Sequence, residues 1–525
     1  MRWMFSIGLI TSACGWVWAD PPALKKLNPK QLDALIAKSL PGDSAPLSDE
    51  FFLRRAHLDL IGRPPTPDEV KAFADDKATD KRLRLVDSLL ASKEFGQHWA
   101  NYWTDTISYK VPPPELTFLN YTRFKAWLAD KFNQNVAWDK ITQEILSASG
   151  DIKKNPAVTF IGYHQGRPAK LAAETARVFL SLQLQCAECH DHKFDSWTRE
   201  EFHGLAAFFG RVSGKLGKAQ DGSSTEVKDL GKGEYVMPNV RDPKKKGQTM
   251  APVLFTGQKL DLDTPDQVRR DHLAKWLTLP SNPYFAKAFV NRVWARLMGR
   301  GFYEPVDNLA DYVEPVLTDL HKDLADHFIA SNFDIKGFYR LLASTEAYQR
   351  STPVGTTMAK QASSYGKTAH LKLNGDEVFK SLTGALGLPN VTPKATKPTD
   401  AIRFPPPPKS TRDIVADKFG YDPNSCGEEV SRTLGQAMLL MNNEQVQKQI
   451  NADPASGTRL AKMVQQEKND RVLVVRLFYQ VLSRQPTEQE IGIALEHLGT
   501  VGQRGPAFED LLWSLINSAE FTSKR

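Results

Sequence analysis

A mainly α-helical protein of two domains is predicted for this chain of 525 residues. Threonines followed three residues later by Glu or Gln recur along the sequence, a pattern typical of helix starts. Apolar residues between these starts recur with the spacing of a helix face. The sequence shows no succession of alternating-polarity strands joined by hairpin turns, which argues against a β-sandwich or a doubly wound sheet.

Four threonines carry the helix-start pattern, in which the Thr hydroxyl accepts a hydrogen bond from the backbone of the third helical residue. A proline follows directly in two of them, which suits the first helical position. We therefore expect helices to begin just after Thr66, Thr198, Thr264 and Thr487, with Glu69, Glu201, Gln267 and Glu490 as their partners.

Two segments show a helical apolar face. The first predicts a helix that runs into Cys186, and the second predicts a helix that ends at Gly299, a typical C-terminal cap. Their apolar positions are Leu171, Thr175, Val178, Phe179 and Leu182 in one, and Phe285, Phe289, Val293 and Leu297 in the other.

The aromatic residues Trp99, Tyr102 and Trp103 also recur at helical spacing and are expected in the core rather than in a sugar-binding surface.

An internal repeat supports the helical prediction. The run Arg63-Pro-Pro-Thr66-x-x-Glu69 matches Arg484-Gln-Pro-Thr487-x-x-Glu490, and each follows an apolar helix with basic residues, at 51–61 and 471–482. The later runs 89–95 and 515–521 are similar, with a third echo at 341–348. We interpret the repeat as a re-used helix–turn–helix packing unit, because two distant copies are too few for a solenoid.

Composition shifts divide the chain. Residues 213–260 are rich in Gly, Lys and Asp, which favours a linker with a small strand pair. We predict a first domain at 28–212, a linker at 213–275 and a second domain at 276–525. A Pro-rich stretch at 391–412 is expected to be an exposed insertion in the second domain.

The N-terminus predicts export. Residues 1–19 combine an early positive charge, an apolar run too short to span a bilayer, and a cleavage site after Ala19, as in a secretory signal peptide. Lipidation at Cys14 is the alternative. No later stretch predicts a transmembrane helix, so we expect a periplasmic or cell-surface protein.

Charge and cysteine content narrow the function. The net charge is +7, without aromatic–basic motifs, so neither this composition nor the compartment favours nucleic-acid binding. Beyond Cys14 only Cys186, Cys189 and Cys426 remain, too few for a disulfide framework. The cysteines are therefore expected to have a chemical role rather than to form structural disulfides.

The chemical centre of the sequence is Cys186-Ala-Glu-Cys189-His190. In this Cys-x-x-Cys-His pattern two thiols add to the haem vinyl groups and the adjacent His becomes the proximal iron ligand. Covalent attachment suits an exported protein, because the cofactor cannot be lost to the medium. The sequence thus predicts a covalently bound haem c held by Cys186, Cys189 and His190.

Two other readings of the motif stay open. His190, Asp191, His192 and Asp195 could hold zinc, iron or copper, since the Asp-His after the motif exceeds what haem attachment needs. The two cysteines could instead form a disulfide or play a structural part, although the βαβ context of redox dithiols is missing.

A haem site has either a second axial ligand or an open face. The candidates for that ligand are Met237, Met250, Met298, His164 and His203.

Near the motif, Asp105, Glu174 and Arg177 could form a buried polar network, but surface pairing is the expectation.

The chain resembles the planctomycete cytochrome-like surface proteins, which pair two domains of unknown function. The similarity lies in residues 52–66 and 186–195 for the first domain, and in 282–286, 290–294, 299–301 and 304–307 for the second. The resemblance implies a cytochrome-like haem, a surface or periplasmic location, and association with secreted sulfatase-like proteins and polysaccharide use. This chain lacks the separate N-terminal cytochrome domain of longer members, so an electron partner would be another protein.

Three functions follow as hypotheses. The first is a redox protein that transfers electrons or oxidises a substrate, in connection with polysaccharide use. The second is a non-haem metal enzyme acting on surface polysaccharide, and the third is a non-catalytic surface module stabilised by the motif.

Overall fold

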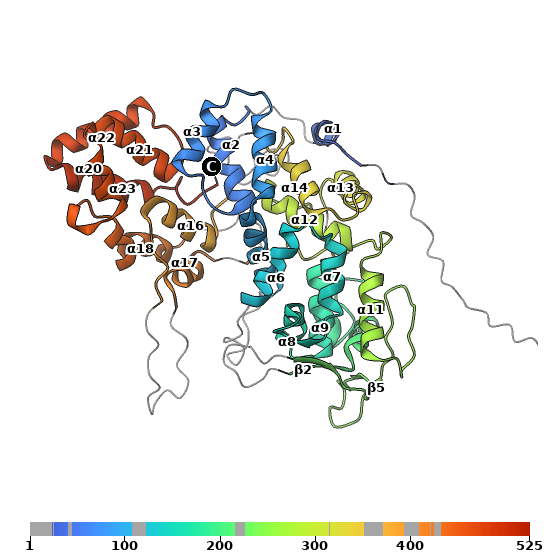
Figure 1. Ribbon diagram of the computed structural model, residues 1–525. Helices are drawn as coiled ribbons and strands as arrows, with labels where there is room; N and C mark the ends of the chain where they lie inside the picture. Colours follow the sequence, from blue (N-terminus) through green and yellow to red (C-terminus); the bar gives the residue numbers. More distant parts are fainter. Residues whose placement is uncertain are drawn as a thin grey trace, which may run out of the picture.

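The computed structural model describes residues 24, 26–39, 45–107, 122–215, 226–313, 315–350, 371–392, 409–420, 422–424 and 432–524. Within them the fold is mainly α-helical, as predicted (Figure 1). The predicted signal peptide with Cys14, the third cysteine Cys426 and most of the Pro-rich stretch 391–412 lie outside the described residues.

A first hydrophobic core gathers side chains from Leu32 to Tyr348. Its helices before the motif are α1 (Pro29–Ser39), α2 (Asp49–Ile61), α3 (Pro67–Asp75), α4 (Lys81–Ala91), α5 (Lys93–Ile107), α6 (Thr122–Asn133), α7 (Trp138–Leu146), α8 (Thr159–Tyr163) and α9 (Pro168–Thr175). Those after it are α10 (Arg199–Ala206), α11 (Asp266–Leu277), α12 (Phe285–Met298), α13 (Thr318–Ala330) and α14 (Ile335–Ala343). Short turns η2 (Pro156–Val158) and η5 (Ala207–Phe209) complete it.

A second core runs from Leu373 to Phe521 and also takes in Leu58 of α2. It is formed by α16 (Gly375–Leu386), α17 (Thr411–Phe419), α18 (Leu434–Asn442), α19 (Glu444–Gln449), η7 (Pro454–Ser456), α20 (Arg459–Gln466), α21 (Asp470–Leu482), α22 (Glu488–Val501) and α23 (Arg504–Ile516). Figure 1 shows these orange and red helices beside α2, α3 and α5. The predicted domain boundary at 213–275 stays a prediction, while the hydrophobic packing divides between residues 348 and 371.

Two small antiparallel sheets contain short segments of the predicted linker. Strand β3 (Glu226–Asp229) lies between β1 (Gly150–Asp151) and β2 (Val212–Lys215), with Gly150 and Gly214 both opposite Val227. Strands β4 (Val236–Met237) and β5 (Gln248–Thr249) form a second pair. Residues 226–275 are therefore joined to the first core, and α11 packs on α7.

The aromatic residues expected in the core are buried there. Trp103 packs against Trp138 with ring centroids 4.2 Å apart and planes tilted by 38°, and Phe289 of α12 lies parallel to Trp103 at 5.8 Å. Trp99 and Tyr102 are also buried. These large side chains, packed edge-to-face or offset, join α5 and α7 to α12 and contribute much of the apolar area removed from water.

Three of the four predicted capping boxes are present, at Thr66, Thr198 and Thr487. The prediction at Thr264 is wrong, because α11 begins at Asp266 and has no side-chain cap from Thr264. Asp229 of β3 accepts a hydrogen bond from the Asp266 backbone instead, and Gln267 turns its amide to the Ser147 carbonyl. A tertiary contact has replaced the local cap.

The sequence repeat is a repeated structural unit. Arg63 bridges Glu69 and Glu94, and Arg484 bridges Glu490 and Glu520 with the same atoms. Each arginine follows a residue in the left-handed region, Gly62 with φ 70° and Ser483 with φ 60°. A side chain at Gly62 would collide with His98, whose Nδ1 would lie 2.2 Å from the added Cβ, so only this copy needs glycine.

The two copies contact each other around α2. The buried Arg54 donates to the Ser483 hydroxyl at 3.4 Å and to the Phe521 carbonyl at 3.3 Å. Both acceptors belong to the second copy. The two copies of the repeat are therefore similar in structure and also contact each other, and this contact is part of the interface between the two cores.

A buried cluster of charges lies beside this interface. Asp59 of α2 accepts from Lys524 at 2.9 Å, from Arg55 at 3.3 Å and from the Tyr348 hydroxyl at 2.8 Å. Lys524 also lies 3.1 Å from Glu377 of α16. The Asp59 and Glu377 side chains are almost fully buried, so hydrogen bonds from neighbouring side chains must replace those that water would make to each carboxylate.

Among the described residues, no helix has both the length and the apolar character required to traverse a bilayer.

We predict that Asp59→Asn destabilises the protein by about 3 kcal/mol, because Arg55 and Lys524 would keep their charges in a buried site without the carboxylate. Urea denaturation of the full chain measures this. Asp87→Asn is the matched control, since Asp87 pairs with Arg340 on the surface and should cost less than about 1 kcal/mol. Equal losses for the two variants would contradict the assigned role.

A second prediction concerns acid. The Arg484 hydrogen bonds lower the pKa of Glu490 to about 2. Stability from this pair is therefore complete above the ordinary pKa of the carboxyl group and is lost as the pH falls towards 2. Arg484→Gln should lower the melting temperature near pH 7 and reduce its fall between pH 5 and pH 3. Arg471→Gln, which alters an exposed pair with Glu488, serves as control, and identical pH profiles for both variants would refute the prediction.

Candidate functional site

The chain enters the Cys-x-x-Cys-His motif through an interrupted helix. Helix α9 passes into the π-helical turn η3 (Ala176–Leu180) and ends at Ser181, whose φ is 55°. The prediction of a helix continuing to Cys186 is therefore wrong. Ser181 is held from outside, because its hydroxyl donates to the Val306 carbonyl at 3.0 Å and its carbonyl accepts from Leu309 at 2.6 Å. π-turns of this kind are frequent at functional sites.

The two cysteines lie on and just after the short 3₁₀ helix η4 (Gln185–Glu188). Both thiols are free and exposed, and the Cys189 backbone donates to the Cys186 carbonyl at 3.3 Å. Ala187, between them, is buried and anchors the turn. The turn therefore presents both sulfur atoms to solvent from one short segment.

The imidazole of His190 is oriented by its neighbour. Its Nδ1 lies 2.7 Å from the Asp191 carbonyl oxygen, which can only accept, so the proton is on Nδ1. In the neutral ring Nε2 is then the atom with a lone pair for a metal, an arrangement common among metal-binding histidines. Two reduced thiols followed by such a histidine fit the donor set of a c-type haem.

The other predicted metal ligands each make a local hydrogen bond. An Asp191 oxygen accepts from the Arg199 backbone at 2.8 Å, at the start of α10. Asp195 accepts from the Ser196 backbone, and His192 Nδ1 accepts from Phe194 at 3.3 Å. Across the described residues, no three His, Cys, Asp or Glu side chains lie in a group able to hold a metal ion.

The proposed second axial ligands have different environments. His203 of α10 is fully buried, with Nε2 donating to the Glu188 carbonyl at 3.0 Å and Nδ1 accepting from the Tyr235 hydroxyl at 2.7 Å. Burial lowers the pKa of His203, which keeps the ring neutral. Nε2 holds η4 through Glu188 and Nδ1 is bound to Tyr235, so both nitrogens are engaged and His203 acts as a positioning residue. Met250, Met298 and His164 are buried, and Met237 is partly buried in β4.

The second half of the chain supplies one side of the motif loop. Tyr312 stacks on His192 with ring centroids 6.2 Å apart, and contacts Phe194 edge-on at 6.1 Å. Asn308 donates to the Tyr312 hydroxyl at 3.0 Å. Phe194 and Tyr312 are both largely exposed, so an apolar surface lies next to the motif.

A buried ion network lies beneath the loop. Arg177 of η3 is 2.7 Å from Glu174 and 3.2 Å from Asp307, and Gln183 donates to Asp307 at 2.8 Å. The expectation of surface pairing is wrong for Glu174 and Arg177, because three of these four side chains are buried, with Gln183 partly so. Asp105 is not part of this network and lines a separate cavity.

Sequence reasoning missed Gln183, Asn308 and Tyr312 as parts of the site. One indication of this region was present in the sequence, the run 304–307, which matched the second-domain pattern but contains no motif typical of catalysis or metal binding. Its Asp307 now binds Arg177, and the same loop holds Ser181. Nothing in the spacing of the two motifs could show that they meet.

The fold and the site define a helical protein in which a surface Cys-x-x-Cys-His loop is held by a loop from the second half of the chain. Residues 32–213 match the family model PSCyt2, described as a protein of unknown function (DUF1549). Residues 269–498 match PSD1, described as a protein of unknown function (DUF1553). The chain therefore carries the paired domains that its motifs led us to expect. Curated proteins and solved structures gave no significant match.

We predict that both thiols of the motif react readily in the folded, reduced protein, because they are exposed. Alkylation with iodoacetamide, read out by peptide mass spectrometry, should modify Cys186 and Cys189 at rates within about tenfold of those in urea. Labelling that requires unfolding would contradict the surface position of the turn.

Proposed function

We propose that this chain is an exported redox protein with one covalently attached haem c. Cys186 and Cys189 are the attachment thiols and His190 is the proximal iron ligand. The observation that carries the proposal is the pair of free, exposed thiols followed by a histidine whose Nδ1 is bound to the Asp191 carbonyl. Bound haem supplies one-electron transfer or oxidation chemistry.

The chain's own residues set the geometry of attachment. His203 fixes the Glu188 carbonyl, and Arg199 of α10 donates to the same oxygen at 3.3 Å. Glu188 therefore keeps its place between the two cysteines. The Asp191 carbonyl orients the His190 ring, so Nε2 is available without a prior rotation.

The loop from the PSD1 region supports this arrangement. Tyr312 limits the movement of His192, and Ser196 donates to Asp311 at 3.1 Å. The exposed Phe194 and Tyr312 offer apolar surface beside the thiols, which suits the edge of a haem group. With one such motif in the sequence, the electron partner would be another protein, such as a cytochrome. A secreted sulfatase-like protein would be an associated partner without a part in electron transfer.

The test is export of the full chain together with the cytochrome c maturation machinery, followed by haem staining on a denaturing gel. We expect the wild type to stain and to show a Soret band, and Cys186→Ala/Cys189→Ala to lose both. Cys426→Ala is the matched control and should stain like the wild type. A His190→Ala variant that keeps its haem should show a shifted Soret band, because the proximal ligand is lost.

A folded wild-type protein without haem would overturn the proposal. Elemental analysis would then separate the other two functions. Stoichiometric zinc, iron or copper lost on His190→Ala would favour a non-haem metal enzyme acting on surface polysaccharide. A metal-free protein would favour a non-catalytic surface module.

A further inference from the structure

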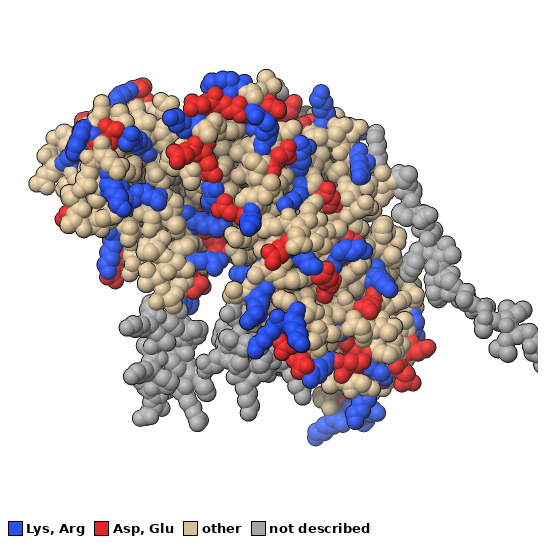
Figure 2. Space-filling model, viewed as in Figure 1, with Lys and Arg blue, Asp and Glu red and all other residues tan. Residues whose placement is uncertain are grey.

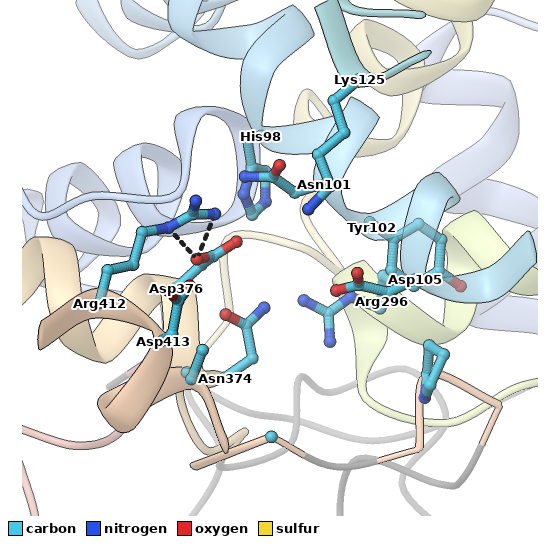
Figure 3. Close-up of a pocket in the computed structure, with 14 residues that line it drawn as sticks. His98, Asn101, Tyr102, Asp105, Lys125, Arg296, Asn374, Asp376, Arg412 and Asp413 are labelled. Atoms are coloured by element: carbon cyan, nitrogen blue, oxygen red, sulfur yellow. Dashed lines mark hydrogen bonds and ion pairs between the residues drawn. The ribbon is translucent and has the colours of Figure 1, made fainter. Parts of the chain in front are cut away.

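A polar cavity lies between the two hydrophobic cores, apart from the Cys-x-x-Cys-His loop. Its volume is about 180 Å³, which suits a small molecule better than a polymer. Helices α5, α6 and α12 contribute one side and α16 and α17 the other (Figure 3). The charged side chains of its lining are Asp105, Lys125, Arg296, Asp376, Arg412 and Asp413.

Three cations reach this cavity from different elements, but they are engaged to different degrees. Arg412 is bound to Asp376 at 2.7 Å. Arg296 lies 3.4 Å from Glu377 and over the Tyr102 ring at 5.3 Å. Lys125 has neither a hydrogen bond nor an ion pair within the described part of the chain. Its ammonium group extends into the cavity in Figure 3.

Two helices also begin at the cavity wall. Asn374 caps α16 and Ser410 caps α17, so the positive ends of both helix dipoles lie near the cavity. The residues of their first turns, Asp376 and Asp413, are already used by Arg412 and by the Ser410 cap. The remaining attraction is for an anion placed near Lys125 and Arg296.

Asp105 gives the cavity a group that changes charge in mild acid. The walls of the cavity remove part of the solvation of Asp105 and raise its pKa to about 6, while the side chain keeps contact with solvent. Asp376 adds repulsion, and Lys125 and Arg412 oppose the rise. His98 stays neutral, because burial lowers its pKa well below the ordinary value. The charged groups that line the cavity with Asp105 are Lys125, Arg296, Asp376, Arg412 and Asp413. Below pH 6 the carboxyl group is therefore a hydrogen-bond donor rather than a repelling charge.

We propose that this cavity binds a small hydroxylated carboxylate, of the size of one sugar acid. Lys125 and Arg296 take the carboxylate, while Asp105 and the amides of Asn101 and Asn374 take hydroxyl groups. Both charge and hydrogen bonding support this class of ligand, because Arg412 and the Ser410 cap already engage two of the three aspartates of the lining. The groups that remain for a ligand are cations, amides and Asp105. The site is independent of haem attachment.

The test is isothermal titration calorimetry on the full chain with D-galacturonate as the probe. Galacturonate should bind more tightly at pH 5 than at pH 7.5, because Asp105 ionises between these values and repels the carboxylate. Lys125→Gln should weaken binding about tenfold, as expected for loss of a charge-assisted hydrogen bond. The Asp105→Asn variant should bind at both pH values with nearly the same affinity, since the amide does not ionise.

Matched controls decide between a site and general charge attraction. Lys71→Gln, at an exposed lysine of α3 that does not line the cavity, should bind like the wild type. D-Galactose, which lacks the carboxylate, should bind at least about tenfold more weakly.

Four results would overturn the proposal: no heat with galacturonate at millimolar concentration, equal binding of galactose, unchanged binding by Lys125→Gln, or equally tight binding of inorganic sulfate. The last would show recognition of charge without hydroxyl groups. Circular dichroism of each variant separates a lost site from a lost fold.

Discussion

The structure depends on the buried charges around Asp59. This carboxylate joins α2 to Lys524 and, through Lys524, to Glu377 of α16, so the two hydrophobic cores meet at a polar centre. On the outer surface, by contrast, Lys and Arg are interspersed with Asp and Glu (Figure 2). A buried cluster of this kind adds little net stability over a well-packed apolar equivalent, but its hydrogen bonds tolerate few alternative arrangements. Arg54 donates hydrogen bonds to Ser483 and Phe521 at the same junction, and the geometry of these bonds restricts the orientation of one core relative to the other. The relative position of the cores is thereby defined by geometry as well as by apolar contact.

The candidate haem loop is held separately from this junction. Its supports come from both family regions: His203 and Arg199 from the PSCyt2 region hold Glu188, and the 306–312 loop from the PSD1 region holds Ser181 and His192. A loop with several exposed residues would otherwise be mobile, because it buries little apolar surface. The pairing of the two domains in one chain has a physical reason, since each holds part of the same loop.

The helices and their caps followed from the sequence because both are local. Thr66, Thr198 and Thr487 act through residues three positions away, and the apolar face of α12 repeats within one helix. The failures involve partners distant in sequence. Asp229 replaced the cap expected from Thr264, and Val306 and Leu309 ended a helix expected to reach Cys186. For the candidate site, spacing predicted the cysteines and His190, whereas Tyr312 and Asp307 lie beside it only through the fold.

The contact between Asp59 and Lys524 spans 465 residues. A chain that emerges from a ribosome or a translocation pore presents α2 long before its partner arrives. Until then Arg54, Arg55 and Asp59 have no complete set of neighbours, and closing so long a loop is slow. The early segment therefore stays exposed to water, and open to chaperones, until the last residues of the chain are present.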